Sequence, residues 1–140
     1  MKKNVIKKAA VIIAILLLVT CGAYAKKKPV FAGYADRFEI YFESGSLGAG
    51  ANVGAAEYSR FNGIKGESCV IDPQYSAEQV IADFGAECVF TEKTEAGVSY
   101  YCYSPRIKYR EYIGGRAVNL HVFEGEDKLM AGAPMIYGSY

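Results

Sequence analysis

The sequence predicts an α+β fold, in which one helix packs on a face of a mostly antiparallel sheet of about six to seven strands. Short apolar segments separated by glycine and proline follow one another through residues 37–140, as strands and turns do. Within that region only residues 77–84 combine helical apolar spacing with helix start and stop signals. Glycine turns join neighbouring strands into hairpins, which favours an antiparallel meander over a parallel sheet.

The first strand is predicted at residues 37–43, where apolar and polar residues alternate. In this strand Phe38, Ile40 and Phe42 face the core. Residues 44–56 are rich in glycine, alanine and serine, and both a flexible loop and a poorly specified strand fit them.

The middle of the chain contains the predicted helix. Residues 57–64 suit a strand or a helix, and residues 68–71 predict a short buried strand. Ser76 is expected to cap the helix at residues 77–84, in a capping box with Gln79, and Gly85 to end it. One helix face then consists of Val80, Ile81 and Phe84.

A first hairpin is predicted from residues 86–92 and 98–104, with Gly97 in the turn. In the expected register Cys88 and Cys102 share the core face but are diagonal, since Cys102 lies opposite Phe90. The opposite, outward face contains Glu87, Val89, Thr91, Ser99, Tyr101 and Tyr103.

A second hairpin is predicted to turn at Gly114-Gly115, pairing Ile113 with Arg116 and Tyr109 with Leu120. Its core face consists of Ile107, Tyr109, Val118, Leu120 and Val122. Its outer face consists of Lys108, Arg110, Asn119 and His121. A last strand follows at residues 129–137, and Pro134 predicts an edge or bulged strand there.

Residues 1–25 have the composition of a signal peptide or membrane anchor. Four lysines precede an uncharged apolar run at residues 9–20, and Ala23-Tyr24-Ala25 is a small-x-small cleavage sequence. Lys26–Lys28 favour an uncleaved anchor, because positive charge after an apolar run resists translocation. The sequence Leu18-Val19-Thr20-Cys21 also resembles a bacterial lipobox, with Cys21 as the lipidated residue and Thr20 departing from the usual small residue.

All three interpretations of the leader predict a secreted or extracytoplasmic membrane-associated protein. Residues 26–36 form a lysine-rich spacer, and residues 37–140 form a single domain. Cleavage after Ala25 removes four lysines and leaves 12 basic against 15 acidic residues, a net charge of about −3. This balance excludes the basic footprint of a nucleic-acid-binding protein, whereas an uncleaved leader would contact a membrane.

The cysteines of the domain are Cys69, Cys88 and Cys102. Outside the cytoplasm they are candidates for one disulfide and a free thiol, and three buried thiols are the alternative. Their spacing, together with His121 on the outer face, predicts no metal site. No cofactor motif or catalytic constellation is present either.

Four tyrosines are candidate ligand-binding residues: Tyr101, Tyr103, Tyr41 and Tyr112. Aromatic stripes on a sheet bind proteins or glycans, so a protein or a cell-wall glycan is the expected partner. The alternative is that a further layer of the same chain covers this face.

The chain resembles small exported, uncharacterised proteins of Gram-positive bacteria, a likeness that implies no activity. It rests on the lysine-rich leader, Tyr100-Tyr101-Cys102-Tyr103-Ser104-Pro105, Val118-Asn119-Leu120-His121-Val122 and Ile136-Tyr137-Gly138-Ser139-Tyr140. The leading hypothesis is an envelope or secreted binding module without enzymatic activity. The alternative is a small exported thiol-dependent enzyme that acts on cell-wall or peptide substrates. A third hypothesis, a strand-donating subunit, depends on an edge strand at the carboxy terminus.

Overall fold

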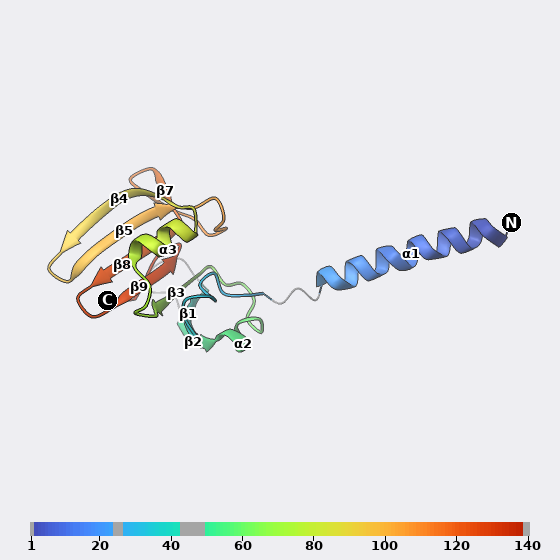
Figure 1. Ribbon diagram of the computed structural model, residues 1–140, viewed down its shortest axis with the longest axis horizontal. Helices are drawn as coiled ribbons and strands as arrows, with labels where there is room; N and C mark the ends of the chain where they lie inside the picture. The colour runs from blue at the N-terminus through green and yellow to red at the C-terminus, as the bar shows by residue number, and fades with distance from the viewer. Residues whose placement is uncertain (1, 24–26, 43–49, 139–140) are drawn as a thin grey trace.

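A computed structural model of the chain describes residues 2–23, 27–42 and 50–138. Its centre is a seven-stranded antiparallel sheet in the order β2-β1-β3-β9-β8-β5-β4, accompanied by short helices (Figure 1). The predicted α+β class is therefore confirmed.

The leader forms helix α1 (Lys2–Ala23), which lies apart from the sheet in Figure 1. The side chains of residues 5–17 are exposed. Among the described residues, no helix combines the length and the apolar character needed to cross a membrane. Cys21 falls within α1, but its side chain lies outside the described residues, as do positions 24–26 around the predicted cleavage site.

The first strands form one end of the sheet. Strand β1 (Arg37–Tyr41) buries Phe38 and Ile40, as the alternating pattern predicts. Strand β2 (Gly50–Gly54) pairs along one side of β1 and continues into the short helix α2 (Ala55–Tyr58). Strand β3 (Gly66–Ile71) pairs along the other side. The glycine-rich stretch therefore ends in a strand, and residues 43–49 lie outside the described residues.

Helix α3 (Ala77–Asp83) begins where its cap was predicted. The Ser76 hydroxyl accepts a hydrogen bond from the Gln79 amide at 3.2 Å. Val80 is fully buried against the sheet, where α3 contacts β8 (Leu120–Gly125). Such a cap contributes about 1 kcal/mol, which matters in a helix of only seven residues.

The hairpin of β4 (Glu87–Thr94) and β5 (Gly97–Tyr103) is present, but its predicted register is wrong. The turn pairs Thr94 with Gly97, and the ladder that starts there places Phe90 opposite Tyr101 and Thr91 opposite Tyr100. A β-bulge at Val89 then shifts the ladder by one residue, so that Cys88 lies opposite Cys102.

The second hairpin turns where predicted but is shorter. Strands β6 (Glu111–Ile113) and β7 (Arg116–Val118) form a separate two-stranded sheet in which Ile113 pairs with Arg116. The predicted pairing of Tyr109 with Leu120 is wrong, because β8 leaves the hairpin and Leu120 pairs with Cys102.

Two residues assigned to the outer face of that hairpin are buried instead. Asn119 sits in the break between β7 and β8, where its side chain binds three backbone groups: it accepts from the Ser104 amide at 2.7 Å and donates to the carbonyls of Ser104 and Ile107 at 2.7 and 3.0 Å. His121 faces the side of Tyr101 on the adjacent strand. Asn119 is buried because the strand changes partners at this position, and His121 is buried because the chain also covers the face opposite α3.

The last strand, β9 (Leu129–Ala133), is an interior strand, so the predicted edge position is wrong. It pairs with β3 on one side and β8 on the other, and the sheet edges are β2 and β4. Pro134 follows the ladder immediately, where no further amide donor is required. The hypothesis of a strand-donating subunit depended on an edge strand at the carboxy terminus, and β9 is not an edge strand.

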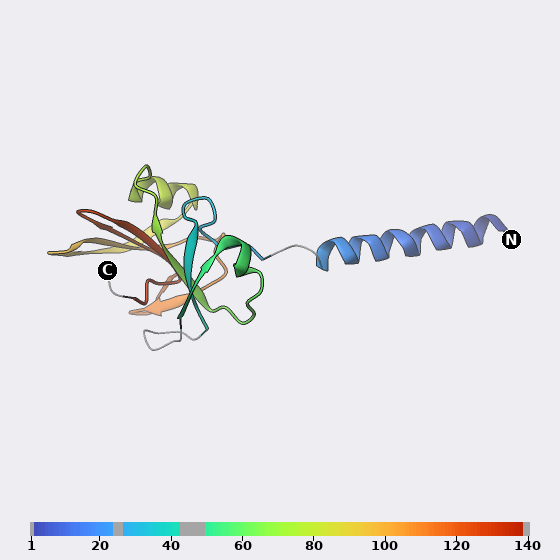
Figure 2. The same cartoon turned by 90° about the horizontal axis from the view of Figure 1, so that it is seen from below.

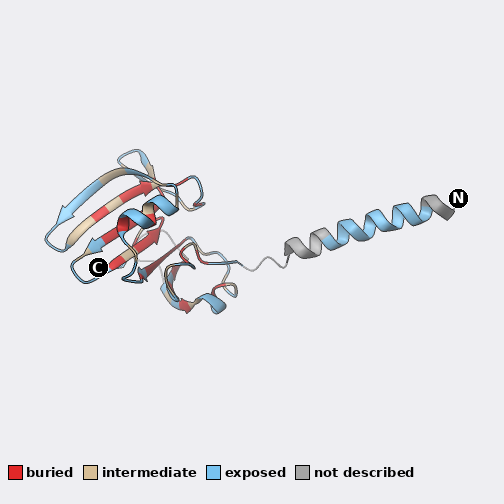
Figure 3. Cartoon of the chain, in the orientation of Figure 1, coloured by how far each residue is buried: buried red, intermediate tan, exposed pale blue. Residues whose placement is uncertain are grey.

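The main sheet is covered on both faces (Figure 2). Seen nearly edge-on, it has α3 on one side and the β6–β7 hairpin on the other. Buried residues run along the central strands in Figure 3. The face beneath α3 forms the main core, which includes Ile40, Val53, Cys69, Cys102, Leu120, Val122 and Ala131.

Candidate functional site

The four candidate tyrosines do not form one exposed surface. Tyr101 and Tyr41 are buried, with exposed fractions of 7% and 3%, so their expected outward position is wrong. Tyr103 is half-buried beneath the guanidinium of Arg110, and Tyr112 on β6 is 65% exposed. The structure thus distributes them between a second core and the β6–β7 hairpin.

Aromatic stacking explains the burial of Tyr101. Its ring lies between Phe90, at a centroid distance of 4.4 Å, and His121, at 4.5 Å, with both pairs nearly parallel. Its hydroxyl donates to a Glu92 carboxylate oxygen at 3.2 Å. The pairing of Thr94 with Gly97 at the turn places Phe90 on this face, a register that differs from the predicted one, and so the stack was not predicted.

The carboxy-terminal residues cover the neighbouring part of this face. A side chain on Gly132 would overlap the backbone of Met135 and Ile136, so the segment after β9 lies directly on the sheet. The Ile136 amide donates to His121 Nδ1 at 3.3 Å, and the Tyr137 ring packs on Tyr41 at 5.1 Å. This face is therefore closed by the chain itself.

The cysteines and the histidine lie on opposite faces. Cys102 pairs with Leu120, whereas the adjacent His121 pairs with Tyr101, so the imidazole points away from Cys88 and Cys102. Burial raises the pKa of the Cys69 thiol and, together with the neighbouring Cys88, raises the pKa of Cys102 to about 12. Neither buried thiol is prepared to act as a thiolate nucleophile. In the part of the chain that the structure describes, no group of three His, Cys, Asp or Glu side chains is placed to hold a metal ion.

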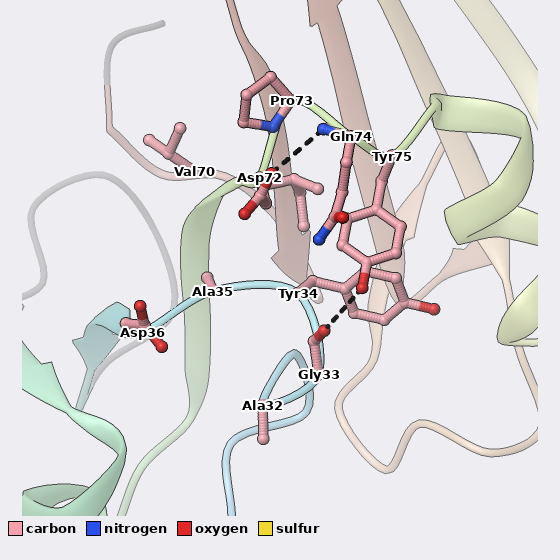
Figure 4. A pocket seen from close by; sticks show the side chains of 11 residues that line it. Ala32, Gly33, Tyr34, Ala35, Asp36, Val70, Asp72, Pro73, Gln74 and Tyr75 are labelled. Carbon is pink, nitrogen blue, oxygen red and sulfur yellow. Dashed lines mark hydrogen bonds between the residues drawn. The ribbon is translucent and has the colours of Figure 1, made fainter.

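Two of the pockets lie beside the segment that precedes β1. The first, with a volume of about 350 Å³, is formed by residues 32–36 and 70–75 (Figure 4). Its polar groups bind one another. The Tyr75 hydroxyl donates to the Gly33 carbonyl at 3.3 Å, and the backbone amide of Gln74 donates to the Asp72 carboxylate at 3.1 Å. These hydrogen bonds hold the two loops together, so the polar groups of this pocket have a structural role.

The second pocket has a volume of about 410 Å³ and is named here the basic pocket. It forms where the spacer before β1, the turn after α2 and the loop between β5 and β6 meet. Its lining combines cations with aromatic and apolar side chains. It consists of Lys27, Lys28, Val30, Tyr58, Phe61, Gly63, Ile64, Arg106, Ile107, Lys108 and Tyr109.

Four cations line the basic pocket, and none of its described lining residues is acidic. Lys27 donates to the Asn62 side chain at 2.9 Å, and Arg106 donates to the Asp83 carbonyl at 2.9 Å. These neutral acceptors hold the side chains without neutralising their charge. The pocket therefore concentrates positive potential around an apolar wall, an arrangement that attracts anions.

Behind the wall lies Glu67, a carboxylate with no exposed surface on the core face of β3. It accepts hydrogen bonds from the amides of Val30 and Phe31, at 2.6 and 3.3 Å, and from the Tyr58 hydroxyl. The Tyr58 hydroxyl in turn lies 3.3 Å from that of Tyr109. Burial raises the pKa of Glu67, while its hydrogen bonds oppose that rise, and burial with Glu67 raises the pKa of Tyr58.

The hydrogen bonds of Glu67 fix the geometry of the basic pocket. They join the spacer, α2 and, through Tyr109, the loop that bears Lys108. Perturbed titratable groups beside a pocket are typical of functional sites. The sequence offered little signal for this arrangement, since Lys27 and Lys28 have the composition of a spacer and Tyr109 that of a strand.

No protein-family model, curated protein or solved structure matches the chain.

Proposed function

We propose that this chain is an exported binding module without enzymatic activity, and that its basic pocket holds an acidic sugar unit of the cell envelope. The observation that supports this most directly is the set of four cations around an aromatic and apolar wall. Phe61 and Tyr109, which are partly exposed, offer flat surfaces for a sugar ring, and the lysines offer charge for its carboxylate or phosphate.

Export through the leader is part of the same proposal. The lysine-rich start, the apolar run and Ala23-Tyr24-Ala25 support it, and so does the separation of α1 from the folded domain. The intact mass of the native protein after cell fractionation tests it. Loss of residues 1–25 would support a cleaved signal peptide, a lipid adduct on Cys21 would support a lipoprotein, and an unprocessed chain in the cytoplasmic fraction would contradict export.

The thiol-dependent enzyme has less support. Such chemistry needs a thiolate beside a base, and His121 lies on the face opposite the cysteines of the hairpin. Proposed binding, by contrast, needs only the pocket and its charge.

Isothermal titration calorimetry of the full chain in detergent tests the ligand class. We expect trigalacturonate to bind and maltotriose, a neutral sugar of equal length, not to bind. Replacing Lys28 and Lys108 by Gln should weaken trigalacturonate binding roughly 2- to 30-fold, since each exposed ion pair contributes about 0.2–1 kcal/mol. Added salt should weaken the wild-type interaction further.

The matched control replaces two exposed lysines outside the pocket, Lys93 and Lys128, by Gln and so keeps the net charge equal to that of the pocket variant. It should retain wild-type affinity. Equal losses in the two double variants would indicate general charge attraction and refute the pocket. Equal binding of maltotriose would refute the acidic ligand.

A further inference from the structure

The edge hairpin of the sheet brings two cysteines into register. Cys88 on the edge strand β4 lies directly opposite Cys102 on β5. Cross-strand neighbours in antiparallel sheets have Cα atoms roughly 4.5–5.5 Å apart, within the roughly 4.4–6.8 Å that disulfides span. The pair can be bridged without moving the strands.

The two thiols are close enough to influence one another. Burial and the neighbouring Cys88 raise the pKa of Cys102, and the Cys88 thiol donates to the Phe90 carbonyl at 3.4 Å. The bulge at Val89 produces this match, because the ladder that pairs Phe90 with Tyr101 would otherwise continue with Val89 opposite Cys102 and would turn Cys88 to the other face.

The third cysteine cannot take part. Cys69 is on β3, and β9 and β8 lie between β3 and β5. Three strand spacings separate Cys69 from Cys102, a distance of about 14 Å. Cys69 is also buried in the main core, so it stays a thiol.

We propose that Cys88 and Cys102 form a disulfide that ties the edge strand β4 to β5, and that an oxidised dithiol protein or a small-molecule disulfide is the oxidant. The exposure of the two residues sets the order of events. Cys88 is exposed and Cys102 is fully buried, so Cys88 meets the oxidant first.

The reaction proceeds in two exchange steps. The Cys88 thiol loses its proton and attacks the oxidant disulfide, which forms a mixed disulfide and releases one thiolate of the oxidant. The Cys102 thiol then loses its proton and attacks the Cys88 sulfur, which releases the second thiolate. Two protein thiols are oxidised, the oxidant disulfide is reduced to two thiols, and the two protons pass to the released thiolates.

The test uses the full chain, purified reduced and then treated with oxidised glutathione. Peptide mapping after alkylation under denaturing conditions should give a peptide linking Cys88 to Cys102, about 2 Da lighter than the sum of its two reduced halves, together with an alkylated Cys69, whatever the state of Cys21 in the leader. Stable glutathione on Cys88 of the wild type, or a bridge that includes Cys69, would overturn the proposal.

Three single variants sharpen the result. Cys69→Ala should form the same bridge as the wild type. Cys102→Ala should accumulate a glutathione adduct on Cys88, because the resolving thiol is missing. Cys88→Ala should leave Cys102 unmodified in the folded protein, and rapid modification there would contradict the order of events.

Amide hydrogen exchange gives a readout on the wild type alone. The bridge closes a 15-residue loop. Because a closed loop gains less conformational entropy when it unfolds, the amides of β4 should exchange up to roughly 100-fold more slowly in the oxidised protein than in the reduced protein. Equal exchange rates for β4 in the oxidised and reduced forms would show that the bridge does not hold the edge strand.

Discussion

Acidification should destabilise the domain through His121, the one histidine of the chain. The side chain is 1% exposed, stacks on Tyr101, and accepts the Ile136 amide at Nδ1. Burial lowers the pKa of His121 to about 4, from an ordinary value of about 6.5. The folded protein therefore keeps this imidazole neutral at pH values where the unfolded chain protonates it.

The magnitude follows from that difference. Between pH 6.5 and 4 the unfolded state binds a proton that the folded state does not, so the contribution is complete above pH 6.5 and is lost as the pH falls through 4. A difference of about 2.5 pKa units corresponds to about 3.4 kcal/mol.

The perturbation is His121→Gln, which keeps a hydrogen-bond acceptor and removes the titration. Urea unfolding at pH 7 and pH 4, followed by circular dichroism, gives the free energy of unfolding of both proteins. We expect the wild type to lose about 3 kcal/mol more than the variant between these pH values. Carboxylates such as Glu67 are common to both proteins, so their contributions cancel in the comparison.

Because His121 is the sole histidine, its Cε1 proton gives an unambiguous NMR titration of the folded wild type. A midpoint near 6.5, or the same acid sensitivity in the variant, would refute the reasoning, since either result would mean that burial does not exclude the charged imidazole.

Three further substitutions test the buried polar groups and the edge hairpin. Glu67→Gln should gain stability relative to the wild type as the pH rises from 4.5 to 7, because burial raises the pKa of Glu67 and its ionisation then lowers the stability of the wild type. The same difference in urea midpoint between variant and wild type at both pH values would contradict this. Asn119→Ala leaves three backbone groups without their partner and should lower stability by about 3 kcal/mol by calorimetry, whereas a loss below about 1 kcal/mol would mean that water replaces the amide. Gly97→Ala should lower it by about 2 kcal/mol or more, because Gly97 has a φ of +151° and an added Cβ would overlap the Glu124 carbonyl oxygen; a wild-type melting temperature would contradict that contact.

Sequence patterns predicted the elements whose partners are close in the chain. Ser76 identified the start of α3, and the Gly114-Gly115 turn gave the pairing of Ile113 with Arg116. Caps and tight turns act over a few residues, so the local sequence determines them.

Features set by distant partners could not be predicted in this way. Pro134 suggested an edge strand, but β9 is interior because β3, which is distant in the chain, pairs along its free side. Similarly, the outward assignment of Tyr101 and His121 failed because Phe90 and the carboxy-terminal segment cover that face. The basic pocket joins Lys28 to Lys108 through contacts that no local spacing records.

The position of β9 in the sheet has a consequence for when the domain can fold. Strands β1 to β3 meet β8, β5 and β4 only through β9, so the two parts remain separate sheets until residues 129–133 are available. A growing chain meets this condition only after residues 129–133 have been made. Long-range pairing of this kind slows folding, because a large loop must close before the ladder forms. The strand order therefore delays completion of the native sheet until β9 has been made and can pair with both of its neighbours.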